Sequence, residues 1–335
     1  ELRIGNSWEL ATDVGPVISA NARQSVQAYI DAAAVKGRLI KTIDKEIRTN
    51  GHFVAPSVIR VNGISDMSEE VFGPVLHVAK FRADSLSQLV NELNASGYGL
   101  TFGLHTRIDS RVEYMIDNLN IGNIYVNRDQ IGAVVGSQPF GGENLSGTGP
   151  KAGGPNYLSR FMLSERSFGQ AISSKKSIAL GQVQAALNLL SRQRVKLKEQ
   201  ELPGPTGESN KLYEYACGVV LCLGVDIESA QAQARTAIEN GCQPLIVCPG
   251  AKGGNSIDGF FPRELLTDLN RVSLVVLWSE NDDVSLARRA LARRAGRIVP
   301  LVCDSRLASG CRLERQVCVD TTAAGGNASL LSMAT

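Results

Sequence analysis

The stretch from Ile121 to Pro155 constrains the fold of this chain more than any other. It begins as a strand, in which Ile124 and Val126 alternate with polar residues. It continues as a loop rich in glycine, the residue that tolerates positive φ and lets a backbone come close to another group. A loop of this kind directly after an apolar strand suits the binding of a small ligand by main-chain N–H groups.

The alternative for this loop is a mobile surface linker, since tracts of glycine, serine and proline often have that role. Large apolar residues are unusual in pure linkers, and this loop contains several, among them Val134, Val135, Phe140 and Leu145. The composition of the loop therefore favours a ligand-binding role.

Length and composition indicate an ordinary soluble protein. With 335 residues the chain can form two domains with buried cores. Its net charge of +2 gives no reason to expect a nucleic-acid partner. The longest apolar runs, such as "CGVVLCLGV", are too short to span a bilayer.

The cysteines and histidines point to no metal centre. All seven cysteines lie in the second half of the chain and none forms a CxxC pair, which speaks against a disulfide framework and a zinc site. The three histidines, His52, His77 and His105, have no metal-like spacing. A reducing, cytoplasmic setting fits this use of cysteine.

Helical and strand patterns alternate over residues 1 to about 165, which predicts an α/β fold with a largely parallel sheet. The first helix is expected to begin at Ser19 and to stop near Gly37. Residues 174–200 read as one long basic helix with an apolar stripe. The prolines and glycines of residues 203–210 predict a domain boundary.

A second alternating unit begins near Tyr213 and forms a Rossmann-like β-α-β series. Its first strand is followed by "GVDIES", which is not G-x-G-x-x-G, and the loop 250–254 is not a phosphate-binding P-loop. We therefore expect a Rossmann-like unit without a working dinucleotide site. An independent nucleotide-binding domain at residues 213–305 remains the alternative.

Three segments in order carry a resemblance to one family. "GNIYVNRDQIGAVVGSQPFGG", followed by "SGTGPKAGGP", resembles the aldehyde-anchor loop of glutamate semialdehyde (Δ1-pyrroline-5-carboxylate) dehydrogenase, in the version found in bifunctional proline-utilisation proteins. "SEEVFGPVLHVAKF" resembles the E-x-F-G-P motif of the aldehyde dehydrogenase superfamily, and "YGLTFGLHTRID" is similar to another segment of it. "LPGPTGE" and the final residues resemble segments of longer members.

The resemblance implies the C-terminal part of an aldehyde dehydrogenase catalytic domain, followed by a Rossmann-like α/β domain. The implied divisions are 1–156 for the catalytic part, 157–170 for an oligomerisation flap strand, 171–205 for the basic helix and linker, 206–317 for the Rossmann-like domain without a dinucleotide fingerprint, and 318–335 for a C-terminal tail motif.

The E-x-F pair implies a site for the cofactor NAD. Glu70 would accept hydrogen bonds from the nicotinamide ribose hydroxyls, and Phe72 would pack on the nicotinamide ring. Without the resemblance, Glu70 reads as an exposed charge at a strand edge and Phe72 as a core residue.

The anchor loop implies a site for the substrate. The N–H groups of Gly132 and Ala133 would receive its α-carboxylate, and Phe140 would pack on its aliphatic stem, for which ordinary core packing is the alternative. Asn127 and Glu143 read as groups that brace the loop, and no further role is assigned to them.

The resemblance also implies that catalytic groups are missing from this chain. The family attacks the aldehyde with a cysteine thiolate and activates water with a glutamate. Both, and the asparagine of the oxyanion hole, precede the first residue here, so we expect no catalytic residue in the chain and no activity from it alone.

The expected parent oxidises proline with FAD in an upstream module and glutamate semialdehyde with NAD. Expected partners are those upstream modules and a second copy bound through the flap strand, with no nucleic acid bound by this chain. Peripheral membrane association is expected for the parent only, and the second domain is expected to act as a structural lid. The alternative is a non-catalytic dimerisation or assembly module.

Overall fold

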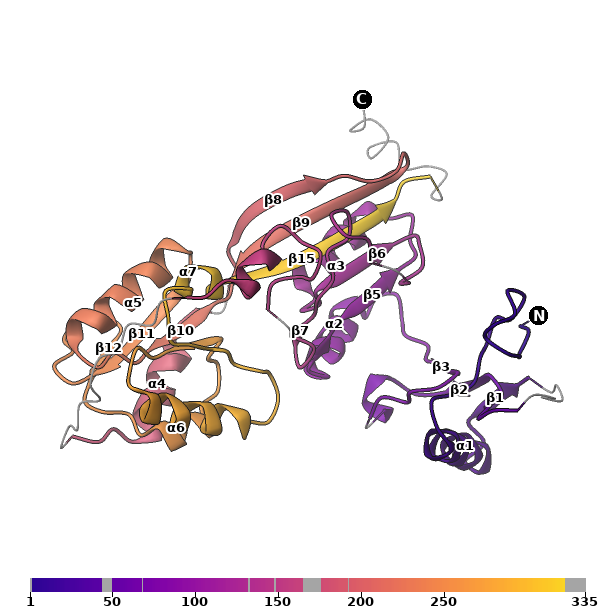
Figure 1. Cartoon of the computed structure of the whole chain (residues 1–335), viewed down its shortest axis with the longest axis horizontal. Coiled ribbons are helices and arrows are strands. Elements are labelled where there is room, and N and C mark those ends of the chain that lie inside the picture. The colour runs from indigo at the N-terminus through magenta and orange to yellow at the C-terminus, as the bar shows by residue number, and fades with distance from the viewer. Residues whose placement is uncertain are drawn as a thin grey trace. The chain divides into compact units, whose positions relative to one another are not determined.

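The computed structural model describes residues 2–43, 50–67, 69–131, 133–147, 149–164, 176–191 and 193–322. The chain divides into two compact units, Glu1–Ser96 and Gly97–Thr335. Both combine helices with parallel and mixed sheets, which confirms the α/β class (Figure 1). Across those ranges, no helix has both the length and the apolar character needed to cross a bilayer.

The first unit packs helix α1 against a small sheet of order β1-β2-β3, in which β2 and β3 are parallel and β1 is antiparallel. The helix begins after Ser19, whose hydroxyl accepts the N–H of Ala22 at 3.2 Å, and it ends before Gly37, which has φ +65°. The elements are α1 (Ala20–Val35), β1 (Leu39–Thr42), β2 (Ser57–Arg60), η1 (Ile64–Asp66), β3 (Val75–Val78) and α2 (Leu86–Ala95).

The second unit contains a parallel five-stranded sheet of order β12-β11-β10-β13-β14. The first strand in the sequence, β10, is central and fully buried, so the order corresponds to 3-2-1-4-5, the order of a Rossmann sheet. The predicted Rossmann-like series is confirmed. Its elements are β10 (Val219–Cys222), α5 (Ile227–Glu239), β11 (Gln243–Cys248), β12 (Ser256–Asp258), η3 (Arg263–Thr267), β13 (Leu274–Val276), α6 (Asn281–Ala292) and β14 (Leu301–Val302).

A second five-stranded sheet has the order β5-β6-β15-β9-β8. Strand β15 lies between β6, to which it is parallel, and β9, to which it is antiparallel (Figure 1). Strand β15, the last strand among the described residues, thus pairs with the strand that leads into the glycine-rich loop. The elements are β5 (Thr101–Leu104), α3 (Asp109–Asn118), β6 (Asn123–Val126), β8 (Lys196–Leu202), β9 (Glu208–Ala216), α7 (Leu307–Gly310) and β15 (Arg312–Asp320), beside a two-stranded pair of β4 (Tyr98–Gly99) and β7 (Glu143–Asn144).

The long basic helix predicted over residues 174–200 is wrong. Helix α4 spans only Leu180–Leu189, and Lys196–Leu202 is strand β8. Its lysines and glutamates are good helix formers, but β9 offers a full row of backbone partners, and sheet pairing overrides the local preference. Within the segment 203–210, residues 203–207 form the turn of the β8–β9 hairpin, and β9 begins at Glu208. Strands β9 and β15 lie in the sheet with β6 and not in the Rossmann sheet.

One shorter element also differs from the sequence pattern. Tyr157–Phe161, expected to begin a flap strand, forms the short 3₁₀ helix η2. The rest of the predicted flap (165–170) and most of the tail motif (323–335) lie outside the described residues.

Candidate functional site

The glycine-rich loop is held tightly where it leaves and returns to the sheet. All four residues of β6 are buried. Gly122, just before this strand, lies so close to the returning limb that an added Cβ would stand 2.1 Å from the carbonyl oxygen of Gly141. After the strand, Asn127 turns the chain with φ +58°, and its Oδ1 accepts the N–H of Thr106 at 2.9 Å. Asn127 therefore braces the loop, as predicted.

A buried lysine links the two limbs of the loop. The Nζ of Lys151 donates to Oδ1 of Asn123 at 3.1 Å and to the carbonyl oxygen of Gly141, and the residue is 1% exposed. Burial lowers the pKa of Lys151 to about 7, against the attraction of Glu143 and Glu314. The amine is thus a structural donor whose charge changes near neutral pH.

Replacing Lys151 with methionine should change how stability depends on pH. Because the folded pKa lies below the ordinary 10.5, the unfolded chain binds more protons between pH 7 and 10.5, and the Lys151 contribution to the free energy of unfolding rises across that window. Urea unfolding at several pH values should show this rise, on the order of a few kcal/mol, in the wild type only. Exposed Lys198→Met is the matched control, and a rise that persists in Lys151→Met would contradict the assignment.

Glu143 ties the end of the loop to distant segments. Its carboxylate accepts from Arg194 at 2.7 and 3.3 Å and from Arg315 of β15 at 3.3 Å. Burial by itself raises the pKa of Glu143, but the two guanidiniums outweigh it and hold that pKa below its ordinary value. Glu143 therefore remains a carboxylate and braces the loop, as predicted.

The outer limb of the loop is tied to β9 and β15. Arg128 donates to Glu208 at 2.7 Å and to the sulfur of Cys318 at 3.2 Å. Gln138 donates to the other oxygen of Glu208 at 2.8 Å. The loop is therefore anchored on both limbs, and the C-terminal strand supplies part of the anchor.

Two backbone N–H groups close to the predicted substrate contacts are already used within the loop. The N–H of Phe140 donates to the carbonyl of Ala152 at 3.0 Å, and the N–H of Gly136 donates to that of Gly153 at 2.9 Å, so neither faces a ligand. Ala133 is exposed, and the hydrogen bonds of the described residues do not use its N–H. Gly132 lies outside the described residues.

The E-x-F segment lies in the first unit, before β3. Gly73 sits so close to α1 that an added Cβ would stand 2.8 Å from a methyl group of Val26, and Val71 packs against the same core. The chain consequently turns Phe72 outward, where it is 81% exposed, and Glu70 is exposed as well. The alternative that Phe72 is a core residue is excluded.

A sequence profile of the aldehyde dehydrogenase family matches residues 1–166. Residues 1–166 are an aldehyde dehydrogenase family domain. Both segments above, the E-x-F turn and the glycine-rich loop, fall within this aldehyde dehydrogenase domain.

Relatives extend the likeness beyond the aldehyde dehydrogenase domain. The bifunctional protein PutA of Escherichia coli (strain K12) is 34% identical over 99% of this chain and 29% of its own length. A 1-pyrroline-5-carboxylate dehydrogenase of Geobacillus kaustophilus is 39% identical over 47% of this chain and 30% of its own length. The chain thus spans less than a third of these relatives.

A solved structure shows the same fold. Proline Utilization A (PutA) from Corynebacterium freiburgense covers 97% of this chain with a TM-score of 0.62, at 21% identity and over 33% of its own length. The shared fold therefore includes the Rossmann-like part of the chain as well as the aldehyde dehydrogenase domain.

The seven cysteines are all buried and none forms a disulfide. Cys318 comes closest to the loop, through Arg128, but burial raises its pKa to about 11, so it stays a thiol. Among residues with described positions, no group of histidine, cysteine and carboxylate side chains could hold a metal ion. His77 instead contacts the hydroxyl of Tyr29 at 2.8 Å.

Sequence reasoning missed Lys151 and Arg315, two buried cations that donate hydrogen bonds to Gly141 and Glu143 of the glycine-rich loop. Lys151 is the one charged residue in the tract "SGTGPKAGGP". A single charge among small residues is a signal that this side chain has a specific hydrogen-bond partner. Arg315 occupies an alternating position in "RLERQVCVD", where nothing local distinguishes a buried arginine from an exposed one.

Proposed function

We propose that this chain is the C-terminal part of a cytoplasmic, PutA-like bifunctional enzyme of proline catabolism. Its aldehyde dehydrogenase domain would contribute to the NAD-dependent oxidation of glutamate semialdehyde to glutamate, and an upstream module with FAD would oxidise proline. The observation that supports this is the likeness to PutA over 99% of the chain, beyond the aldehyde dehydrogenase match at 1–166.

The residues of the first unit suit NAD. Phe72 is 81% exposed, so its ring offers an apolar face to a flat heterocycle. Glu70 is exposed close to it in the sequence and offers a carboxylate to two hydroxyl groups. NAD⁺, when bound, accepts the hydride of the reaction, and these two side chains would only hold and orient it.

The loop suits the acid end of the substrate. The N–H of Ala133, with that of Gly132, would donate to the α-carboxylate, and the half-buried Phe140 would pack on the aliphatic stem. The rigid limbs of the loop, fixed by Lys151 and Glu143, would keep these donors in place. The thiolate that attacks the aldehyde would come from an upstream part of the parent, because Cys318, the cysteine that contacts Arg128 of the loop, has a pKa raised by burial.

Replacing Phe72 with alanine in the full-length enzyme should raise the KM for NAD⁺ up to roughly tenfold, because an aromatic contact is worth about 0.5–1.5 kcal/mol. Steady-state NADH formation from glutamate semialdehyde at varied NAD⁺ concentration measures this KM. Phe81→Ala is the control, since Phe81 is also exposed, at 60%, in the same unit. Equal effects of the two variants would argue against the proposed cofactor contact.

The same assay on the isolated chain tests whether the nucleophile is missing from it, which both the proposal and its alternative, a non-catalytic dimerisation or assembly module, require. We expect no NADH from the chain alone, whereas cysteine-dependent NADH would contradict the missing nucleophile.

The assembly role draws support from apolar side chains on residues 158–163: Leu158 is 71%, Phe161 74% and Leu163 103% exposed. We propose that a second copy of the chain binds at residues 158–163 and that the Rossmann-like part acts as a structural lid in the parent enzyme.

A further inference from the structure

Three buried cysteines converge where the β9–β15 pair meets the Rossmann sheet. The sulfur of Cys217 lies 3.6 Å from the sulfur of Cys242. The sulfur of Cys242 lies 3.5 Å from the carbonyl oxygen of Cys311, which also accepts the N–H of Cys217 at 2.7 Å. Elements far apart in the sequence therefore bring thiols together that share no CxxC motif.

The geometry of Cys217 and Cys242 allows a disulfide. Their sulfurs are about 1.5 Å farther apart than the roughly 2.05 Å of a disulfide bond. Each cysteine lies in a short connection, Cys217 between β9 and β10 and Cys242 between α5 and β11. Each also adjoins a glycine of positive φ, Gly218 at +106° and Gly241 at +74°, so the backbone can make a small adjustment.

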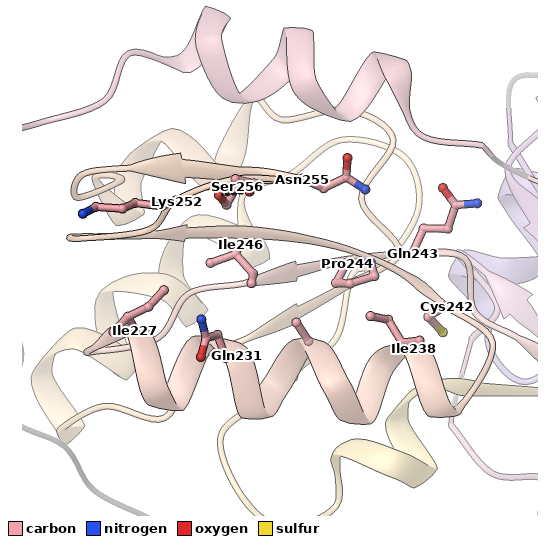
Figure 2. A pocket seen from close by; sticks show the side chains of 13 residues that line it. Ile227, Gln231, Ile238, Cys242, Gln243, Pro244, Ile246, Lys252, Asn255 and Ser256 are labelled. Carbon is pink, nitrogen blue, oxygen red and sulfur yellow. Dashed lines mark hydrogen bonds between the residues drawn. The ribbon is translucent and has the colours of Figure 1, made fainter.

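A groove gives a small reagent access to Cys242. Strands β11 and β12 are parallel but are joined by the short loop 249–255 instead of a helix, which leaves the sheet beside α5 uncovered. The resulting groove has a volume of about 380 Å³. Figure 2 shows Cys242 at one end of it, beside Ile238 and Gln243, and Lys252 at the other end.

The hydrogen bonds distinguish the two thiols. The thiols of Cys217 and Cys311 and the backbone of Gly218 stabilise the anionic sulfur of Cys242, and they lower its pKa although burial opposes them. The pKa of Cys217 is raised by its hydrogen bonds to Cys242 and Cys311 and then by burial. The carbonyls of Cys311 and Asn240, at 3.5 and 3.8 Å, still offer an acceptor when Cys242 is protonated. Cys242 is thus the thiol that ionises first.

We propose that Cys242 and Cys217 form a redox-active dithiol that hydrogen peroxide converts to a disulfide. The thiolate sulfur of Cys242 attacks one peroxide oxygen, the O–O bond breaks and hydroxide leaves, which gives a sulfenic acid. The sulfur of Cys217 then attacks the sulfur of Cys242 and the S–O bond breaks. The departing hydroxyl takes the proton of Cys217 and leaves as water. The two sulfurs together lose two electrons, and the peroxide is reduced to hydroxide and water.

The test treats the native full chain with hydrogen peroxide, blocks the remaining thiols by alkylation and maps the peptides by mass spectrometry. We expect a chain lighter by two hydrogens, a Cys217–Cys242 link that dithiothreitol reverses, and loss of alkylation at Cys242 roughly tenfold faster than at Cys248. Cys248 is the internal control, because burial raises its pKa to about 11 and it lies outside the cluster.

Variants identify the order of the steps. Cys217→Ser should leave a sulfenic acid on Cys242 that dimedone traps, Cys242→Ser should abolish the link, and Cys248→Ser should leave it unchanged. A link between other cysteines, or oxidation of Cys242 no faster than of Cys248, would overturn the proposal. The wild-type peptide map decides this even where a variant fails to fold.

Discussion

Replacing Arg315 with alanine should lower the free energy of unfolding by about 3–5 kcal/mol. The guanidinium is 1% exposed on β15 and donates to the carbonyls of Leu119 at 2.5 Å and Ile121 at 3.0 Å. It also pairs with Glu143 and lies over the ring of Tyr215 at 5.1 Å. Alanine would remove the donor from three carbonyls, that of Ile116 included, and one of the cations that keep Glu143 ionised, so the loss is much larger than that of one hydrogen bond.

Urea unfolding of the full chain measures this loss. Lys211→Ala is the control in the same sheet, because Lys211 lies on β9 and pairs with Glu199 at 2.9 Å in a partly exposed ion pair. Such a pair contributes about 0–1 kcal/mol. A similar loss in both variants would show that Arg315 does not hold β15 against the strand that carries the loop.

Replacing Gly122 with alanine should cost about 3 kcal/mol of stability. The new Cβ would stand 2.1 Å from the carbonyl oxygen of Gly141 and 2.9 Å from the Cα of Gly142. Both are backbone atoms of the returning limb of the loop, so neither can move aside as a flexible side chain would. The limbs must separate, which also strains the Lys151 contact to Gly141.

The matched control for Gly122→Ala is Gly181→Ala. Gly181 lies in the first turn of α4, and an added Cβ there would meet no atom within 4 Å. Alanine should be neutral there or stabilise the chain by up to about 1 kcal/mol. Urea unfolding compares the two variants. If both substitutions are equally harmless, the close approach at Gly122 does not constrain the loop.

Local features of the fold followed from local signals in the sequence. Ser19 and Gly37 bound α1 as predicted, because a capping hydroxyl and a left-handed glycine act within a few residues of the chain. The Rossmann-like alternation could be predicted for the same reason, since buried parallel strands are continuous apolar runs. The E-x-F motif before β3 identified Phe72 as a candidate contact. Its exposure follows from the packing of its neighbours Val71 and Gly73 against the core of the first unit.

The sequence by itself determined the α/β class, the caps of α1 and the position of the glycine-rich loop. Only the tertiary structure decided that Lys196–Leu202 is a strand, that β15 pairs with β6, and that Arg315 is buried. The physical reason is the distance along the sequence between the residues that interact. A helix cap is satisfied within one turn. Lys196–Leu202 depends on its pairing with β9, which follows in the same hairpin, whereas β15 and Arg315 depend on partners that the fold supplies from about 200 residues away.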